Sequence, residues 1–278
     1  MKHSSKKLTS TEMQHLCKTI RQSIIDLVYQ SKSGHIAGPL SGVEQYVALY
    51  FNDILKYNPK KPAWENRDRV VISNGHYAPL VYSVLAEASY FNKEKLHQSF
   101  RQFESIFQGH PNKKTPGIET ASGPVGEGLS QAIGMALASK LNKNSYQVYC
   151  LMGDGEQQEG SVWEAVMFAA KHKIDNLTCL IDRNQIQIDG HTEKTMPIDS
   201  LKKKYESFNW KVLEVNGHNI KEISNALNQA KFIHDEPTVI ICNTISGKGI
   251  PFIENKPEWH SKVISKEIYD KMTKALGN

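Results

Sequence analysis

The feature that most constrains the fold is the alternation of strand-like and helix-like segments between residues 147 and 243. Short runs rich in Val, Ile and Leu are separated by segments whose apolar residues recur at helical spacing. Apolar strands that alternate with helices indicate a parallel sheet covered by helices on both faces. The expected strands are 69–73, 147–152, 177–182, 211–215 and 238–243. We therefore predict an α/β fold in a single domain over residues 1–278, with residues 1–10 as a flexible terminus.

Helical periodicity predicts the segments that cover this sheet. The expected helices span residues 11–31, 42–52, 77–90, 93–103, 128–141, 160–173 and 220–231. Ser10 or Thr11 is the expected N-cap of the first helix. The helix at 128–141 is rich in small residues, so we expect close packing at Gly134, Ala136 and Ala138. The long loop at 105–128 is rich in Gly, Pro, Thr and Ser, and a loop of this length in a compact chain is usually functional.

The composition narrows the function classes. Hydrophobic residues make up 39% of the 278 residues, which is enough for a packed core. The net charge is +5 and the basic residues are scattered, so we expect no nucleic-acid binding. We also expect no membrane span, because no apolar run is long enough, and a cytoplasmic location, because the first residues do not resemble a signal peptide. The four cysteines form no CxxC pair, which favours buried free thiols over a zinc site.

Ligands of parallel sheets bind beyond the carboxyl ends of the strands, and the sequence GDG at 153–155 follows one such end. The glycines permit a sharp turn, and the start of the next helix favours a phosphate. Asp154 would repel that phosphate unless a divalent cation such as Mg²⁺ lay between them. Asn184 follows the next strand and can bring an amide oxygen to the same ion. In the alternative interpretation, Asp154 only caps a helix. The GDG turn by itself favours this alternative, whereas the combination of Asp154 with Asn184 favours the cation site.

This pairing resembles the diphosphate–metal motif of thiamine-diphosphate enzymes, and a longer set of motifs resembles the transketolase family. The motifs are SGH at 33–35, SNGH at 73–76, GHP at 109–111, SGPVGEGLS at 122–130, GDGEQQEG at 153–160, IDG at 188–190, TISGKG at 244–249 and WH at 259–260. They follow the family order from residue 33 to residue 260, so the resemblance covers nearly the whole chain.

The resemblance implies thiamine diphosphate and Mg²⁺ as cofactors, with Ca²⁺ or Mn²⁺ as substitutes for Mg²⁺. The positions that match the metal ligands are Asp154, Asn184 and the backbone carbonyl of Ile186. The positions that match cofactor-binding residues are His76, Gly123, Pro124, Val125, Asp154, Gly155, Glu159, Asn184 and His260. Among these, Gly123, Pro124 and Val125 match the loop over the aminopyrimidine ring.

The resemblance also implies catalytic roles for four residues. His35, His110 and His260 match histidines that line the substrate channel, and Glu159 matches a carboxylate that contacts the activating glutamate of a partner domain. Histidine suits such a channel because its ordinary pKa lies near neutrality, so it can exchange a proton with a sugar hydroxyl.

The resemblance covers only the diphosphate-binding module of the family. No stretch of the chain resembles the pyrimidine-binding or C-terminal domains, which carry the activating glutamate. We therefore expect the N-terminal subunit of a split transketolase, inactive alone and completed by a C-terminal subunit in an α2β2 assembly. The expected reaction transfers a two-carbon ketol unit from a ketose phosphate to an aldose phosphate.

Three alternatives stay open at this point. A 1-deoxyxylulose-phosphate synthase more usually has Gly-Gly at Glu159-Gly160, and a 2-oxo-acid dehydrogenase α subunit favours Asn-Asn at Arg183-Asn184. The third alternative is a non-catalytic homologue that only binds the cofactor.

Four residues depart from the usual family pattern, and we expect them around the substrate channel: Ile36, Pro39, Glu127 and Ser261. The donor sugar is therefore not predicted.

Overall fold

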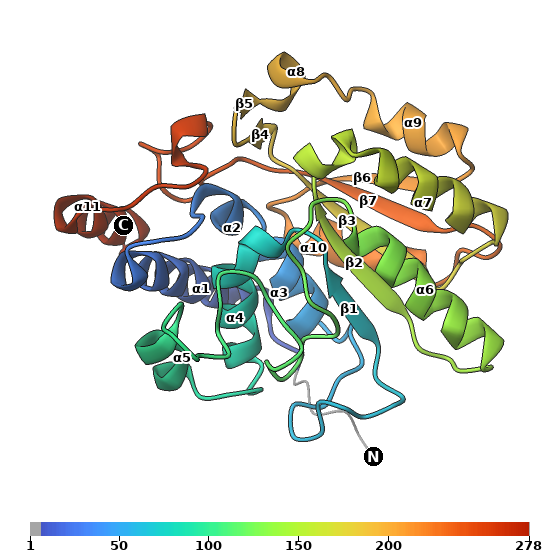
Figure 1. The fold of residues 1–278 in the computed structure, drawn as a ribbon, viewed down its shortest axis with the longest axis horizontal. Coiled ribbons are helices and arrows are strands. Elements are labelled where there is room, and N and C mark those ends of the chain that lie inside the picture. The colour runs from blue at the N-terminus through green and yellow to red at the C-terminus, as the bar shows by residue number, and fades with distance from the viewer. Residues whose placement is uncertain (1–6, 278) are drawn as a thin grey trace.

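The computed structural model describes residues 7–277, which contain a five-stranded parallel sheet in the order β1-β2-β3-β7-β6 (Figure 1). The strands are β1 (Arg69–Ile72), β2 (Val148–Gly153), β3 (Leu177–Arg183), β6 (Lys211–Asn216) and β7 (Thr238–Asn243). Every neighbouring pair in this sheet is parallel. The predicted strands and the predicted α/β fold are thus confirmed. A short antiparallel hairpin of β4 (Ile186–Gln187) and β5 (Gly190–His191) was not predicted.

Helices cover both faces of the sheet, as Figure 1 shows. One layer contains α1 (Ser10–Ser31), α3 (Val43–Phe51), α4 (Ala78–Glu87) and α10 (Ile220–Ala230), and the other contains α6 (Gly128–Leu141), α7 (Gly160–Lys171) and α9 (Leu201–Ser207). Successive side chains of β3 enter opposite layers, because Leu180 belongs to the first core while Cys179 and Ile181 belong to the second. Burial on both faces explains why β2, β3 and β7 are mainly apolar, whereas the edge strand β6 is only partly buried and carries Lys211 and Glu214.

Four further helices and three 3₁₀ turns lie among the described residues. They are α2 (Ala37–Ser41), α5 (Lys93–Ser99), α8 (Thr192–Thr195) and α11 (Lys266–Gly277), with the 3₁₀ turns η1 (Gly75–Tyr77), η2 (Gly155–Gln158) and η3 (Pro257–Trp259). The sequence pattern did not predict α2, α8, α9 or α11. Helix α5 ends at Ser99, earlier than the predicted residue 103, because the backbone of Phe100 is already non-helical with ψ of 124° and Arg101 then takes a left-handed conformation with φ of 57°.

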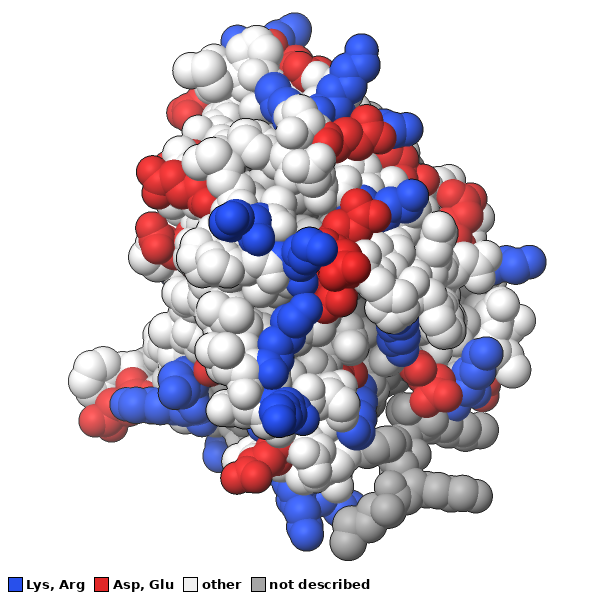
Figure 2. Space-filling view, turned by 90° about the vertical axis from the view of Figure 1, so that its right-hand side faces the viewer, with Lys and Arg blue, Asp and Glu red and all other residues white. Residues whose placement is uncertain are grey.

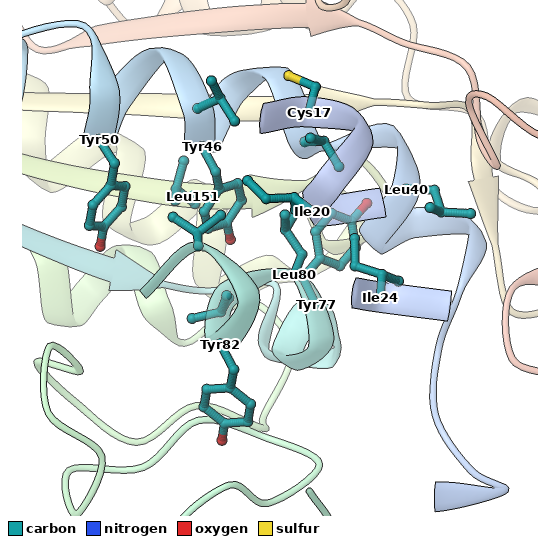
Figure 3. Packing of buried hydrophobic residues seen from close by; sticks show 14 of the residues in the cluster. Cys17, Ile20, Ile24, Leu40, Tyr46, Tyr50, Tyr77, Leu80, Tyr82 and Leu151 are labelled. Atoms are coloured by element: carbon teal, nitrogen blue, oxygen red, sulfur yellow. The ribbon is translucent and has the colours of Figure 1, made fainter. Parts of the chain in front are cut away.

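The first core is built from α1, α3 and α4 against the sheet. Figure 3 shows Ile20 and Ile24 of α1 among the aliphatic and aromatic side chains that surround them, and Leu80 of α4 is also fully buried. Tyr46 and Tyr77 place their rings in this core while their hydroxyls find partners, Asn74 and Asp182 respectively. Buried tyrosines usually need such a partner, and here the partners lie at the ends of strands.

The N-terminus of α1 differs from its prediction. Thr9, rather than Ser10 or Thr11, is the N-cap, and it forms a capping box with Glu12. The Leu8 N–H donates to the carbonyl of Phe51 at 3.3 Å. Leu8 and Thr9 are therefore tied to the packed structure, whereas residues 1–6 of the expected flexible terminus lie outside the described residues.

The remaining expectations from composition concern the surface and the thiols. Figure 2 shows basic and acidic side chains interspersed on the face it displays. Within residues 7–277, no helix has the length and hydrophobicity needed to cross a bilayer. The four cysteines are free and buried, as predicted.

Close packing of α6 occurs at Gly128 rather than at the predicted Gly134. A Cβ at Gly128 would lie 2.4 Å from the Ser73 Cβ, whereas a Cβ at Gly134 would meet nothing within 4 Å. Ala136 is buried, as expected, but Ala138 is only half-buried. The helix thus approaches the end of β1 at its first residue, next to the loop that leads to η1.

The two glycines of α6 make a matched test of this packing. Gly128→Ala should lower the free energy of unfolding by about 1–3 kcal/mol, because the new methyl group overpacks against Ser73. Gly134→Ala should raise it by about 0.5–1 kcal/mol, because alanine reduces the entropy of the unfolded chain without a clash. Urea unfolding followed by circular dichroism measures both changes. Equal effects of the two substitutions would contradict the assigned packing.

Candidate active site

The register of β2 and β3 brings two polar chain segments to the same edge of the sheet. Gly153 pairs with Asp182, so the residues that follow the two strands emerge side by side. A cavity of about 400 Å³ opens at this edge. Every predicted site residue except Pro124 lines it: His35, His76, His110, Gly123, Val125, Asp154, Gly155, Glu159, Asn184, Ile186 and His260. Pro124 is exposed to solvent instead.

Asp154 is a buried carboxylate, 2% exposed, and one of its two oxygens accepts hydrogen bonds. Its Oδ2 accepts hydrogen bonds from Arg183 Nη1 at 3.0 Å and from the Gln185 N–H at 2.6 Å. No described residue donates a hydrogen bond to Oδ1. Burial raises the pKa of Asp154 to about 7, although the Arg183 guanidinium opposes this rise. A buried carboxylate with a second oxygen beside a cavity is suited to a cation.

Asn184 is held in one orientation by its neighbours. Its Nδ2 donates to Tyr77 OH at 3.0 Å, to Asp182 Oδ2 at 3.1 Å and to Ser41 Oγ at 3.2 Å. Its Oδ1 accepts from the Ile186 N–H at 3.0 Å. The amide nitrogen is therefore committed to the protein side. The amide oxygen is directed away from Asp182, as a cation ligand would need.

Asp182 organises this edge of the sheet, and sequence reasoning missed it. The side chain is completely buried and accepts hydrogen bonds from Ser41, Gln45, Tyr77 and Thr244 in addition to Asn184. Burial raises its pKa, and these donors oppose the rise. Asp182 is the last residue of the predicted strand 177–182, directly after an apolar run. A carboxylate inside a strand predicted to be buried was the signal that could have indicated it.

Glu156 is a second buried carboxylate that the sequence analysis missed. Its Oε1 accepts from Ser73 Oγ at 2.6 Å, and its Oε2 accepts from the Gly153 N–H at 3.2 Å. Burial raises the pKa of Glu156 to about 7. The 3₁₀ turn η2 folds this side chain back under the strand end, although the polar stretch EQQE looks solvent-exposed in the sequence.

Three of the predicted histidines form one cluster at the cavity wall. The ring centroids of His35, His76 and His260 lie 5.0–5.4 Å apart. One backbone bond and one side-chain bond hold the segments of His35 and His260 together: the Ile36 N–H donates to the His260 carbonyl and Ser261 Oγ donates to the Gly34 carbonyl, each at 3.3 Å. The motifs near residues 35 and 260 thus meet in the fold, in keeping with the shared substrate channel that the resemblance implied.

These histidines are poised to be neutral. Burial, followed by the charge of His260, lowers the pKa of His35 to about 4. Burial also lowers the pKa of His76 and of His260. The pKa of the more exposed His110 is lowered by partial burial and then by the Arg101 charge. A neutral imidazole has one donor and one acceptor nitrogen, so the cluster can bind hydroxyl groups.

The long loop at 105–128 contributes its end to the site. Gly126 has a φ of 83°, and a Cβ there would lie 2.8 Å from the Glu159 Cβ. The loop therefore passes directly against Glu159. Val125 is 53% exposed while it also lines the cavity. Glu159 is exposed at the cavity rim, where a second chain can reach it.

The four family departures are not part of the cavity wall, contrary to expectation. Ile36 and Pro39 are buried, Glu127 and Ser261 are exposed, and none of them lines the cavity. Ser261 contacts the site indirectly, because its hydroxyl joins the two segments that carry His35 and His260. Gln158, Ile188 and Asp189 also line the cavity, although the sequence analysis named them only within motifs and gave them no role, and Gln187 lines it without having been named.

A parallel α/β sheet with an acid–amide pair at neighbouring strand ends and a histidine-lined cavity defines a cofactor-binding domain of the thiamine-diphosphate class. Residues 12–278 match the family described as "Transketolase, thiamine diphosphate binding domain". The chain belongs to the transketolase family.

Relatives of two lengths match this chain. It is 40% identical over 256 residues to one subunit of the apulose-4-phosphate transketolase of Phocaeicola vulgatus, a match that covers 92% of this chain and 90% of the relative. It is 38% identical to the 6-deoxy-6-sulfo-D-fructose transketolase subunit SqwG of a Clostridium species, covering 93% of this chain and 94% of the relative. Human transketolase is 37% identical over 92% of this chain, which spans only 41% of that protein.

Solved structures agree with this assignment. The transketolase of Campylobacter jejuni superimposes with a TM-score of 0.91 at 35% identity. The match covers 97% of this chain but only 43% of the Campylobacter chain. The chain therefore spans less than half the length of such solved transketolases.

The pKa of His35 gives a test of the cavity's electrostatics. We expect the His35 ring to titrate near 4 in the folded chain and near 6.5 in the urea-unfolded chain, as followed by NMR. Because the folded-state pKa is the lower one, protons favour the unfolded state. The stability linked to His35 is fully present above pH 6.5 and is lost as the pH falls towards 4. A folded-state midpoint near 6.5 would show that the cavity does not desolvate this ring.

Proposed function

We propose that this protein is the N-terminal, diphosphate-binding subunit of a two-chain transketolase. The reaction transfers a two-carbon ketol unit from a ketose phosphate to an aldose phosphate. The observation that carries this proposal is the pattern of lengths among the relatives. Proteins named as transketolase subunits are matched over 90% and 94% of their length, whereas human transketolase is matched over 41%.

The residues of the site fit thiamine diphosphate with a divalent cation. Asp154, the Asn184 amide oxygen and the Ile186 carbonyl supply hard oxygen ligands of the kind that Mg²⁺ prefers, with Ca²⁺ or Mn²⁺ as substitutes. Within residues 7–277, no three His, Cys, Asp or Glu side chains converge as a metal site. The cation would therefore use the amide and carbonyl oxygens together with the single carboxylate.

Further residues would hold the organic part of the cofactor. Gly155 and His76 line the cavity near the cation site and would face the diphosphate. The loop of Gly123, Pro124 and Val125 would cover the aminopyrimidine ring, with Pro124 outside the cavity wall. When bound, the cofactor supplies a nucleophilic carbon and an electron sink for cleaving the bond next to a ketose carbonyl.

The histidines of this chain would handle the substrate. His35, His110 and His260 would donate hydrogen bonds to sugar hydroxyls or accept hydrogen bonds from them. Their low pKa values keep them neutral near pH 7, so a ring nitrogen is free to take up a proton from a substrate hydroxyl during reaction. The proton would be returned readily, because burial disfavours the charged ring.

A partner subunit would complete the site. Glu159 is exposed at the cavity rim and would meet the activating glutamate on the C-terminal subunit, which would bring the pyrimidine-binding and C-terminal domains. We propose an α2β2 assembly with sugar phosphates as substrates. The buried free thiols favour a reducing compartment, in keeping with a cytoplasmic location.

The alternatives have less support. The family match and the named subunits favour a transketolase over a 1-deoxyxylulose-phosphate synthase or a 2-oxo-acid dehydrogenase component. A non-catalytic homologue would not need the neutral histidine cluster beside the cation site.

Reconstitution tests the proposed function directly. This chain alone should show no ketol transfer, and activity should appear when it is mixed with its partner subunit, thiamine diphosphate, Mg²⁺ and a ketose phosphate. A coupled assay for the released aldose phosphate measures the reaction. Full turnover by the isolated chain, or decarboxylation of a 2-oxo acid by the pair, would refute the proposal.

Asp154→Ala tests the cation site. The substitution removes the only carboxylate in the proposed ligand set, so metal-dependent binding of thiamine diphosphate should be lost, as measured by isothermal titration calorimetry. Asp175→Ala is the matched control, because Asp175 pairs with Lys140 on the surface and lies outside the cavity. Unchanged cofactor affinity in Asp154→Ala would contradict the assignment.

A further inference from the structure

Arg183 is a buried cation beside the proposed metal site, and neither the motif analysis nor the proposed reaction gives it a role. It is the last residue of β3, is 5% exposed, and lies directly before Asn184 in the chain. Its Nη1 donates to Asp154 Oδ2 at 3.0 Å and to Thr192 Oγ1 at 2.8 Å. Its Nη2 donates to Glu193 Oε1 at 2.7 Å and to Asp199 Oδ1 at 3.0 Å.

The carboxylates around Arg183 carry more negative charge than its guanidinium neutralises. Glu193 and Asp199 both bind Nη2 and can neutralise the guanidinium from the side away from Asp154. Three carboxylates therefore surround one guanidinium, and this excess of negative charge favours a divalent cation next to Asp154. An arginine paired with Asp154 alone would instead repel that cation.

The hydrogen bonds of Arg183 also restrict how Asp154 can bind a metal. Oδ2 is occupied by Arg183 Nη1 and by the Gln185 N–H, so Oδ1 is the oxygen left for the cavity side. A carboxylate held in this way can coordinate through one oxygen only. Mg²⁺ takes six ligands in near-ideal octahedral geometry, whereas Ca²⁺ takes six to eight and accepts two oxygens from one carboxylate.

The same guanidinium fixes the segment that supplies the other two proposed ligands. Thr192 and Glu193 begin α8, directly after the β4–β5 hairpin, and the Thr192 N–H donates to the Gln185 carbonyl at 3.0 Å. The segment that contains Asn184 and Ile186 begins directly after Arg183. The Arg183 side chain binds Thr192 and Glu193 at the far end of this segment, and it also binds Asp154. Mg²⁺, which demands the stricter geometry, depends more on this restraint than Ca²⁺ does.

We propose that Arg183 is a positioning residue that makes the site selective for Mg²⁺ over Ca²⁺ by holding Asp154 to one-oxygen coordination. The inference rests on the metal site of the proposed function and adds to it the residue that determines which cation is preferred. Arg183 does this without touching the metal, through the Asp154 oxygen that it occupies.

The test compares the affinities of two cations for the complex of this chain with its partner subunit. Isothermal titration with Mg²⁺ and with Ca²⁺, each at saturating thiamine diphosphate, gives the ratio of their dissociation constants. In Arg183→Met, the Mg²⁺ dissociation constant should rise by roughly 10- to 100-fold, as is common when a residue behind a metal ligand is lost. The Ca²⁺ constant should change by less than about threefold, because Oδ2 then keeps only the Gln185 N–H and its vacated side gives Ca²⁺ a second oxygen.

Two further variants separate this role from general destabilisation. Arg67→Met removes a half-buried arginine that pairs with Glu119, neither of which lines the cavity, and should leave the ratio unchanged. Arg183→Met combined with Glu193→Gln removes a carboxylate that the single variant leaves unpaired, and should show the same altered ratio in a chain that folds more stably. Circular dichroism confirms folding of each variant.

The outcomes are distinct. An unchanged ratio in the folded Arg183 variants, or an equal loss of affinity for both cations, would overturn the inference while leaving the metal site intact. Failure of the wild-type complex with its partner subunit to bind either cation with thiamine diphosphate would overturn the proposed metal site itself, and this inference with it.

Discussion

The parallel pairing of β2 with β3 is the interaction on which the rest of the site depends. Its register sets Gly153 opposite Asp182, and so determines where Asp154 and Asn184 emerge relative to each other. A slip of one residue would move Asn184 by about 3.3 Å along the strand and turn the β3 side chains to the other face. Because both faces of the strand are buried under helices, such a slip would place apolar residues wrongly in both cores. Core packing therefore fixes the geometry of the polar site.

Asp182 connects the end of β3 to the neighbouring helices and loops through its hydrogen bonds. A buried carboxylate is costly unless it is hydrogen-bonded, and here donors from α2, α3, η1 and the end of β7 satisfy it. Two of these donors, Ser41 and Tyr77, lie close in the chain to His35 and His76. The carboxylate thus ties the histidine-bearing segments to the same strand end that presents Asn184. The segments that carry the cation site and two of the histidines are therefore joined through Asp182, which explains why motifs far apart in sequence meet at one site.

Much of the fold could be predicted because its signals are local. Strands buried on both faces are recognisable as continuous apolar runs, and the long amphipathic helices by their period. Short elements were missed, since the five residues of α2 carry no periodic signal. The close approach of α6 was assigned to Gly134, although only Gly128 meets a neighbour, because a small residue marks close packing only where something packs against it. Thr9, not Ser10, caps α1, as adjacent candidates differ only in backbone conformation.

The sequence by itself determined the parallel α/β architecture, the strand ends at which ligands bind, and the ordered motifs of the transketolase family. The tertiary structure alone decided which polar side chains are buried. Glu156 and Arg183 look like surface residues in the sequence, and both lie within the site with their charges paired or hydrogen-bonded. It also decided the charge state of His35, since burial rather than residue type lowers its pKa. The physical reason is that desolvation depends on contacts between segments far apart in the chain, which no local pattern records.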